Sequence, residues 1–254
     1  MAKGNIPLIH NYCDRWCERC YFTSRCAIYA SERMAPPAEP DSKNKAFLDR
    51  LSHNFAKAHT VLEQAAEKFG VDLEAIQKDI ESTEGKHEKN FQLMLNHPLI
   101  KLTREYSEFS NNWLKTQPGM LDKLEKLKEN LTMGIESREE AKTQTHTIKD
   151  CLEVIQWYER FLEVKLMRAL TGKADADELE LEDDFPRDHD GSAKVALIGI
   201  DRTMHAWASL FELLPEQEDH FLKALSMLEK MKTMTLAEFP DAMAFLRPGF
   251  DEEL

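Results

Sequence analysis

The sequence has little of what disordered, membrane-spanning or β-rich proteins need. Its 254 residues include only 9 Gly and 10 Pro, which argues against collagen-like and against Pro- and Gly-rich disordered chains. No apolar run approaches the ~20 residues of a membrane-spanning helix, and the N-terminus lacks the apolar segment of a signal peptide. Alternating apolar and polar residues bounded by hairpin turns, which indicate β-strands, are nearly absent. We therefore expect a soluble, cytoplasmic protein without β-sheets.

Positive charge is also scarce. The chain has 33 Lys and Arg residues against 46 Asp and Glu residues, which gives a formal net charge of −13 at pH 7. This excess of negative charge repels phosphate backbones and anionic lipids. Neither nucleic acid nor a membrane is therefore the expected partner, whereas a protein partner is compatible with acidic helices. The exception is the N-terminus, because residues 1–30 hold four basic side chains against two acidic ones.

Helical periodicity, in contrast, is abundant. In residues 47–69 the apolar positions recur every three or four residues, as on the buried face of an α-helix, and Gly70 then provides a stop signal. Pro98 fits the first turn of a later helix, and Ser137 with Glu140 forms a capping box that opens a long one. These signals predict an all-α fold, a helical bundle of about six or seven helices.

Breaks in this periodicity divide the chain. The long helix is expected to end at Gly172, because residues 173–190 hold nine acidic and two basic side chains that favour an exposed, self-repelling loop. The next helix is expected after Gly191. We predict two parts, which are an N-terminal metal-binding arm of residues 1–40 and an α-helical bundle of residues 41–254 that contains the acidic loop.

Four of the five cysteines are concentrated within fourteen residues of the N-terminal arm. Their spacing is Cys13-x3-Cys17-x2-Cys20-x5-Cys26. A cytoplasmic chain is kept reduced, so clustered cysteines there favour metal binding over disulfides. Five charged residues lie between the first and last of them, which a core of plain thiols would not accept. The cluster therefore predicts that Cys13, Cys17, Cys20 and Cys26 ligate a metal.

Two kinds of metal centre suit four thiolates at this spacing. Structural zinc usually joins two separated Cys-x2-Cys knuckles, but only Cys17 and Cys20 form one here. Iron–sulfur clusters commonly take their ligands from one compact run. A 4Fe-4S cluster is therefore the first prediction, and zinc is the alternative. The fifth cysteine, Cys151, lies on an apolar helical stripe, which predicts a buried thiol outside the metal site.

The ten residues from Cys17 to Cys26 also carry a local resemblance. Their Cys-x2-Cys-x5-Cys spacing, with aromatic residues directly after Cys20, resembles the cysteine staple of iron–sulfur nucleases from CRISPR and helicase–nuclease systems. In those families the fourth cysteine is remote in sequence, whereas here it would be Cys13. The nuclease domain is an α/β fold, and no strands are predicted for this chain. The resemblance thus implies an iron–sulfur cluster but no nuclease activity.

A second metal site inside the bundle is a further hypothesis. Helical bundles hold two metals with inward Glu residues and Glu-x-x-His pairs, and Glu84 with His87 is one such pair. Buried carboxylates and histidines often only hydrogen-bond to one another instead. The other polar residues placed near the predicted core are Glu159, Asp201, His205, His59 and Glu63.

Three functions remain open from the sequence. The first is a metal-binding protein whose iron–sulfur cluster serves electron transfer, redox sensing or structural support. The second is a di-iron carboxylate oxidoreductase that receives electrons from the cluster, and the third is a protein-interaction module with structural zinc. The sequence identifies neither a substrate nor a reaction, and no residue is predicted to be catalytic.

Overall fold

The structure, a computed structural model, confirms the all-α class. It describes residues 4–34, 45–70, 72–73, 78, 88–117, 119–178 and 187–251, and every regular element within these ranges is a helix. The chain divides into two compact units, Met1–His10 with Arg15–Lys89 and Asn11–Asp14 with Asn90–Leu254. The helix of residues 45–69 falls in the first unit, and the expected boundary at residue 40 stays a prediction. No helix in the described ranges has both the length and the apolar character needed to cross a membrane.

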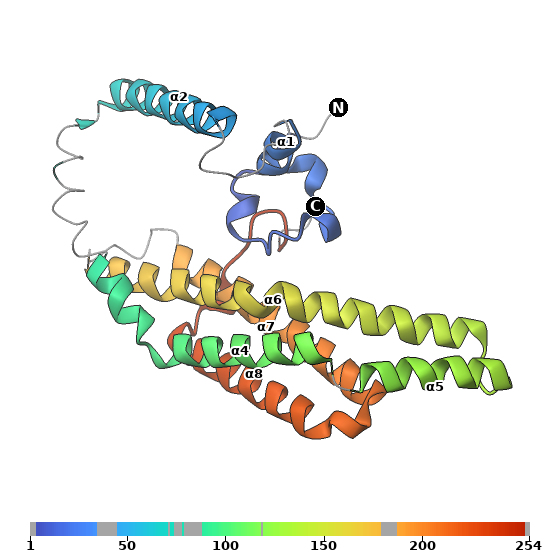
Figure 1. The fold of residues 1–254 in the computed structure, drawn as a ribbon. Coiled ribbons are helices and arrows are strands. Elements are labelled where there is room, and N and C mark those ends of the chain that lie inside the picture. Colours follow the sequence, from blue (N-terminus) through green and yellow to red (C-terminus); the bar gives the residue numbers. More distant parts are fainter. Residues whose placement is uncertain are drawn as a thin grey trace. The chain divides into compact units, whose positions relative to one another are not determined.

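The described residues of the first unit include short turns and the helices α1 (Ala27–Met34) and α2 (Lys45–Phe69) (Figure 1). The apolar stripe of residues 47–69 was expected to form a buried face. Its large side chains that the structure describes are exposed instead, and Phe55 keeps 67 % of its surface in contact with solvent. Helix α2 ends where predicted, since Gly70 adopts the left-handed conformation (φ +67°) that favours glycine. The 3₁₀ turns are η2 (Cys17–Arg19) and η3 (Thr23–Arg25); a further turn, η1 (Ile9–Asn11), precedes them.

The second unit is a helical bundle. Helix α6 packs along α7, α7 packs on α8, and α4 contacts both α6 and α8, while α5 lies beside the N-terminal half of α6 (Figure 1). Its elements are α4 (Pro98–Thr116), α5 (Met120–Met133), α6 (Arg138–Glu178), α7 (Asp188–Leu213), η4 (Pro215–Gln217), α8 (Glu218–Glu238) and η5 (Ala242–Ala244).

Aromatic side chains form the centre of the bundle. Trp207 of α7 donates a hydrogen bond from Nε1 to the hydroxyl of Tyr106 in α4 (2.9 Å), and its ring meets Trp113 edge-on at 4.8 Å. Helices α6 and α7 approach closely at Gly199, where an added Cβ would lie 2.9 Å from the ring of Tyr158. The predicted apolar stripe of α6 is buried at this contact, so burial of that stripe holds the two longest helices together.

Local signals placed several helix boundaries correctly. Helix α4 begins at Pro98, and the Nδ1 atom of His97 accepts a hydrogen bond from the backbone N–H of Leu99 (3.3 Å). The capping box is formed as predicted. The backbone N–H of Ser137 donates to Glu140 Oε2 (2.8 Å), and the N–H of Glu140 donates to Ser137 Oγ (3.2 Å).

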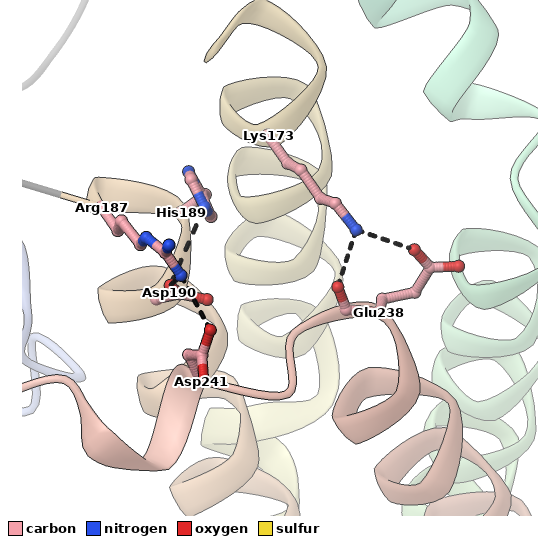
Figure 2. Close-up of polar contacts among 6 residues, drawn as sticks. All are labelled: Lys173, Arg187, His189, Asp190, Glu238 and Asp241. Atoms are coloured by element: carbon pink, nitrogen blue, oxygen red, sulfur yellow. Dashed lines mark hydrogen bonds and ion pairs between the residues drawn. The ribbon is translucent and has the colours of Figure 1, made fainter. Parts of the chain in front are cut away.

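The predicted end of α6 and start of α7 are wrong. Helix α6 continues past Gly172 to Glu178, and α7 begins at Asp188 rather than after Gly191. Long-range contacts explain the first difference (Figure 2): Lys173 Nζ donates to the backbone oxygen of Glu238 (2.8 Å) at the C-terminus of α8. The predicted loop range 173–190 is therefore helical at both of its ends, up to Glu178 and from Asp188, and residues 179–186 lie outside the described residues.

Acidic side chains in the first turn of α7 explain the second difference. A helix N-terminus carries partial positive charge and favours carboxylates. Asp190 is nearly buried, and Arg187 Nη1 lies 3.8 Å from its Oδ2 while contacting Asp241 Oδ2 at 2.8 Å (Figure 2). His189 Nε2 is also 3.8 Å from the same Asp190 oxygen. The ion pairs with Arg187 offset the negative charge that was expected to make this segment an exposed loop.

Candidate metal centre

All five cysteines lie in the described part of the chain, and none is half of a disulfide bond. Cys151 is buried in α6, as predicted, and burial raises the pKa of its thiol to about 11. The four N-terminal cysteines are only half-buried. Cys13 belongs to the second unit, whereas Cys17, Cys20 and Cys26 belong to the first. The clustered thiols are therefore closer to solvent than the core thiol is.

Tight backbone turns position three of the cysteines. The N–H of Cys20 donates to the carbonyl of Cys17 (3.2 Å), which places the two residues in one turn and their Cα atoms within about 7 Å of each other. The N–H of Phe22 donates to Cys20 Sγ (3.4 Å). A second turn ends at Cys26, whose N–H donates to the carbonyl of Thr23 (3.4 Å). Three of the four cysteines thus lie in or at the end of tight turns.

Basic residues lie between these cysteines in the chain. The guanidinium of Arg19 lies 3.9 Å from the ring centre of Trp16. Arg25 Nε donates to the carbonyl of Gly4 (3.3 Å), and the N–H of Ile6 donates to the carbonyl of Arg25 (2.9 Å). The contacts of Arg25 tie residues 4–6 to η3.

On the bundle side, contacts with α7 and Phe245 fix Tyr12, the residue before Cys13. The Tyr12 ring is buried against Phe245 (ring centres 4.8 Å apart), and its hydroxyl donates to Asp188 Oδ1 (3.0 Å). Burial, assisted by this bond to a carboxylate, raises the pKa of Tyr12 to about 12. The ring fits because Gly191 has no side chain: a Cβ there would lie 2.5 Å from Tyr12 Cε1.

Contacts with α6 and α7 fix Asp14, the residue after Cys13. The hydroxyl of Tyr158 donates to Asp14 Oδ2 (2.7 Å), and Arg202 of α7 forms an ion pair with the same oxygen. Trp157 Nε1 donates to the backbone oxygen of Asp14 (3.0 Å). Burial is the main reason that the pKa of Tyr158 is raised, so its hydroxyl remains a donor at neutral pH. Cys13 is therefore held between two residues that are bonded to α6 and α7.

The cysteine side chains do not gather at one point. Within the described ranges, no three His, Cys, Asp or Glu side chains lie close enough together to hold one metal ion. Of the four predicted ligands, the structure places Cys17 and Cys20 in one turn. Metal binding by all four would thus require the cysteine side chains and the turns between them to rearrange.

Glu159 and Asp201, two predicted ligands of a second metal, have other partners. Glu159 is buried in α6 but accepts hydrogen bonds from Ser107 Oγ (3.2 Å) and Asn111 Nδ2 (3.1 Å). Asp201 accepts from Lys232 Nζ (2.7 Å). These contacts satisfy both carboxylates without a metal, which is the alternative that the sequence also offered.

Of the remaining candidates for a second metal, the structure describes three. His205 is exposed on α7. His59 Nδ1 lies 3.3 Å from Glu63 Oε1 on α2, with the two side chains 71 % and 56 % exposed. Glu84 and His87 lie outside the described residues.

The residues that hold Cys13 were not found from the sequence. Trp157 and Tyr158 lie on or beside the apolar stripe of α6, where only a core role was expected, and Arg202 is an ordinary charged position on α7. The nearest signal was the aromatic residue directly before Cys13. Comparison of the chain with protein-family models, with curated proteins and with solved structures gave no match.

Proposed function

We propose that this is a metal-binding helical protein in which Cys13, Cys17, Cys20 and Cys26 ligate one iron–sulfur cluster. The cluster would serve electron transfer, redox sensing or structural support. The observation that carries the proposal is the presence of four thiols, none of them in a disulfide, within fourteen residues. Four cysteine ligands leave no open coordination position, so the proposal includes no Lewis-acid catalysis.

The anchoring of Cys13 supports this proposal. Its neighbours Tyr12 and Asp14 are hydrogen-bonded to the bundle, so a centre bound to Cys13 would be attached to α6 and α7. Only three residues separate Cys13 from Cys17, which limits the distance between their Cα atoms to about 14 Å in any conformation. The second ligand can therefore reach a centre held at the first.

The turns of the cysteine segment also support it. Hydrogen bonds from backbone N–H groups to sulfur tune metal-bound thiolates, and Cys20 Sγ already accepts one from Phe22. Neither η2 nor η3 contains a buried residue, so rearranging these turns disrupts little apolar packing. In zinc-finger peptides the apparent binding free energy of structural zinc is about 10–16 kcal/mol even though the peptide folds on binding, so metal binding can drive such a rearrangement.

Zinc is the second candidate, with a role in protein interaction. The observation that favours it is the turn from Cys17 to Cys20 with its N–H···S bond to Cys20, since Cys-x2-Cys pairs also hold structural zinc. No contact of the described residues favours the di-iron oxidoreductase, because Glu159 and Asp201 are satisfied by hydrogen bonds.

Metal analysis of the full chain, purified without oxygen, tests the proposal. We expect a brown protein with about four irons per chain. Simultaneous replacement of Cys13, Cys17, Cys20 and Cys26 by Ser should abolish the iron and the colour, because all the ligands are removed. The matched control is Cys151→Ala, which removes the core thiol and should leave the iron content unchanged.

Other outcomes decide between the alternatives. A colourless protein with about one zinc per chain would replace the cluster by the zinc candidate. Iron that persists in the fourfold Ser variant would show that it binds elsewhere. A wild-type protein that binds neither metal would end the proposal, provided that circular dichroism shows the bundle to be folded.

A further inference from the structure

Helix α2 carries a regular seven-residue repeat. Leu48, Leu51, Phe55 and Leu62 lie on one side of it, and the sequence continues the same alternating steps of three and four through Ala58, Ala65 and Phe69. A strict repeat of this kind over three heptads is typical of helices that wrap around another helix. At 1.5 Å per residue, the 25 residues of α2 provide about 38 Å of such a face.

This face, defined by Leu48, Leu51, Phe55 and Leu62, is exposed. The four side chains keep 44 %, 40 %, 67 % and 57 % of their surface in contact with solvent. Large apolar side chains in one continuous stripe are rarely left in water and mark interaction surfaces. Among the residues that the structure describes, no other helix packs extensively against α2.

We propose that a second copy of this chain supplies such a helix, so that two α2 helices pair through this face. In coiled coils, charged residues beside the apolar seam normally determine which helices pair with each other. Here those flanking positions hold Ser52, Asn54, His59, Val61, Ala66 and Lys68. Lys68 is the only Lys, Arg, Asp or Glu among these six residues. Two identical helices can therefore meet without the like-charge contacts that disfavour self-pairing.

The charge of α2 also favours a second copy. The chain as a whole has a net charge of −13, which repels other copies from its acidic surfaces. Helix α2 departs from this pattern, because it holds four Lys and Arg residues against three Asp and Glu residues. Its nearly balanced charge makes α2 a surface on which two copies can approach each other. The pairing is independent of the proposed metal centre.

Sedimentation equilibrium of the full chain tests the pairing. The wild type should have twice the chain mass of 29.4 kDa. Phe55→Glu and Leu62→Glu should each shift the protein to the monomer, because each puts a charge into the apolar seam of both copies. The dissociation constant of the dimer should rise at least about 100-fold. Thr60→Glu, which adds the same charge to an exposed position outside the seam, should remain dimeric.

A wild-type monomer at 100 µM, the upper end of the concentration series, would overturn the proposal. So would variants that all remain dimeric, since the copies would then pair elsewhere, or a Thr60→Glu variant as monomeric as Leu62→Glu, since added charge alone would then be responsible. Far-UV circular dichroism identical to that of the wild type shows that the monomeric variants are folded.

Discussion

Replacing Gly191 with alanine is expected to lower the free energy of unfolding of the bundle by about 2–3 kcal/mol, because it displaces the Tyr12 ring from α7. The new Cβ would lie 2.5 Å from Tyr12 Cε1 and 2.8 Å from Phe245 Cε1, both well inside van der Waals contact. Tyr12 cannot move away without losing its burial and its hydrogen bond to Asp188. The gain in helix propensity from Gly to Ala, about 1 kcal/mol, offsets only part of this loss.

Urea denaturation measures the effect, and Gly172→Ala is a matched control. Gly172 also lies inside a helix, but a Cβ there would make only an ordinary contact of 3.6 Å with His189. That variant should be unchanged or stabilised by up to about 1 kcal/mol. In a Tyr12→Ala background, Gly191→Ala should lose part of its destabilising effect, because only the contact with Phe245 at 2.8 Å remains. Equal stabilities for Gly191→Ala and Gly172→Ala would contradict the packing of Tyr12 on α7.

The second large effect is expected on the rate at which trypsin cleaves the cysteine segment. Trypsin cleaves after arginine, and Arg15, Arg19 and Arg25 lie between the cysteines. If the four thiolates hold one metal centre, this segment must release the metal before it can enter the protease. We therefore expect metal-loaded protein to be cut at these three sites at least about 100-fold more slowly than metal-free protein.

Mass spectrometry of the fragments measures the three cleavage rates. The metal is removed with EDTA for zinc, or with EDTA and ferricyanide for an iron–sulfur cluster. The variant with all four N-terminal cysteines replaced by Ser is the control, and it should be cut at the fast rate whether or not metal is present. Identical rates for metal-loaded and metal-free wild-type protein would show that no metal orders this segment.

Most of the fold follows from signals that act within one or two helical turns. The start of α4 at Pro98, the capping box of Ser137 and Glu140, and the left-handed Gly70 each depend on neighbouring residues only. The end of α6 does not. A glycine inside a helix is unfavourable by about 1 kcal/mol, so a stop at Gly172 was reasonable, but the contact between Lys173 and the end of α8 joins residues that are 65 positions apart.

The candidate site shows the same limit. The spacing of the cysteines is visible in the sequence, and so is their chemistry. The network of Asp14 with Tyr158 and Arg202 is not, because its members are separated by 144 and 188 positions and have no shared pattern. Gly191 gives a misleading signal, since the sequence predicts a helix only after it, whereas it lies inside α7 and accommodates the Tyr12 ring.

X-ray absorption at the metal edge of the anaerobically purified full chain tests most directly whether the four N-terminal cysteines bind one centre. We predict a first coordination shell of sulfur atoms at about 2.3 Å. A single zinc would have four of these sulfur neighbours, and a cluster would add neighbouring iron atoms beyond the sulfur shell. A shell made only of nitrogen and oxygen at about 2.0–2.2 Å would contradict the account, because the metal would then be bound by residues other than Cys13, Cys17, Cys20 and Cys26.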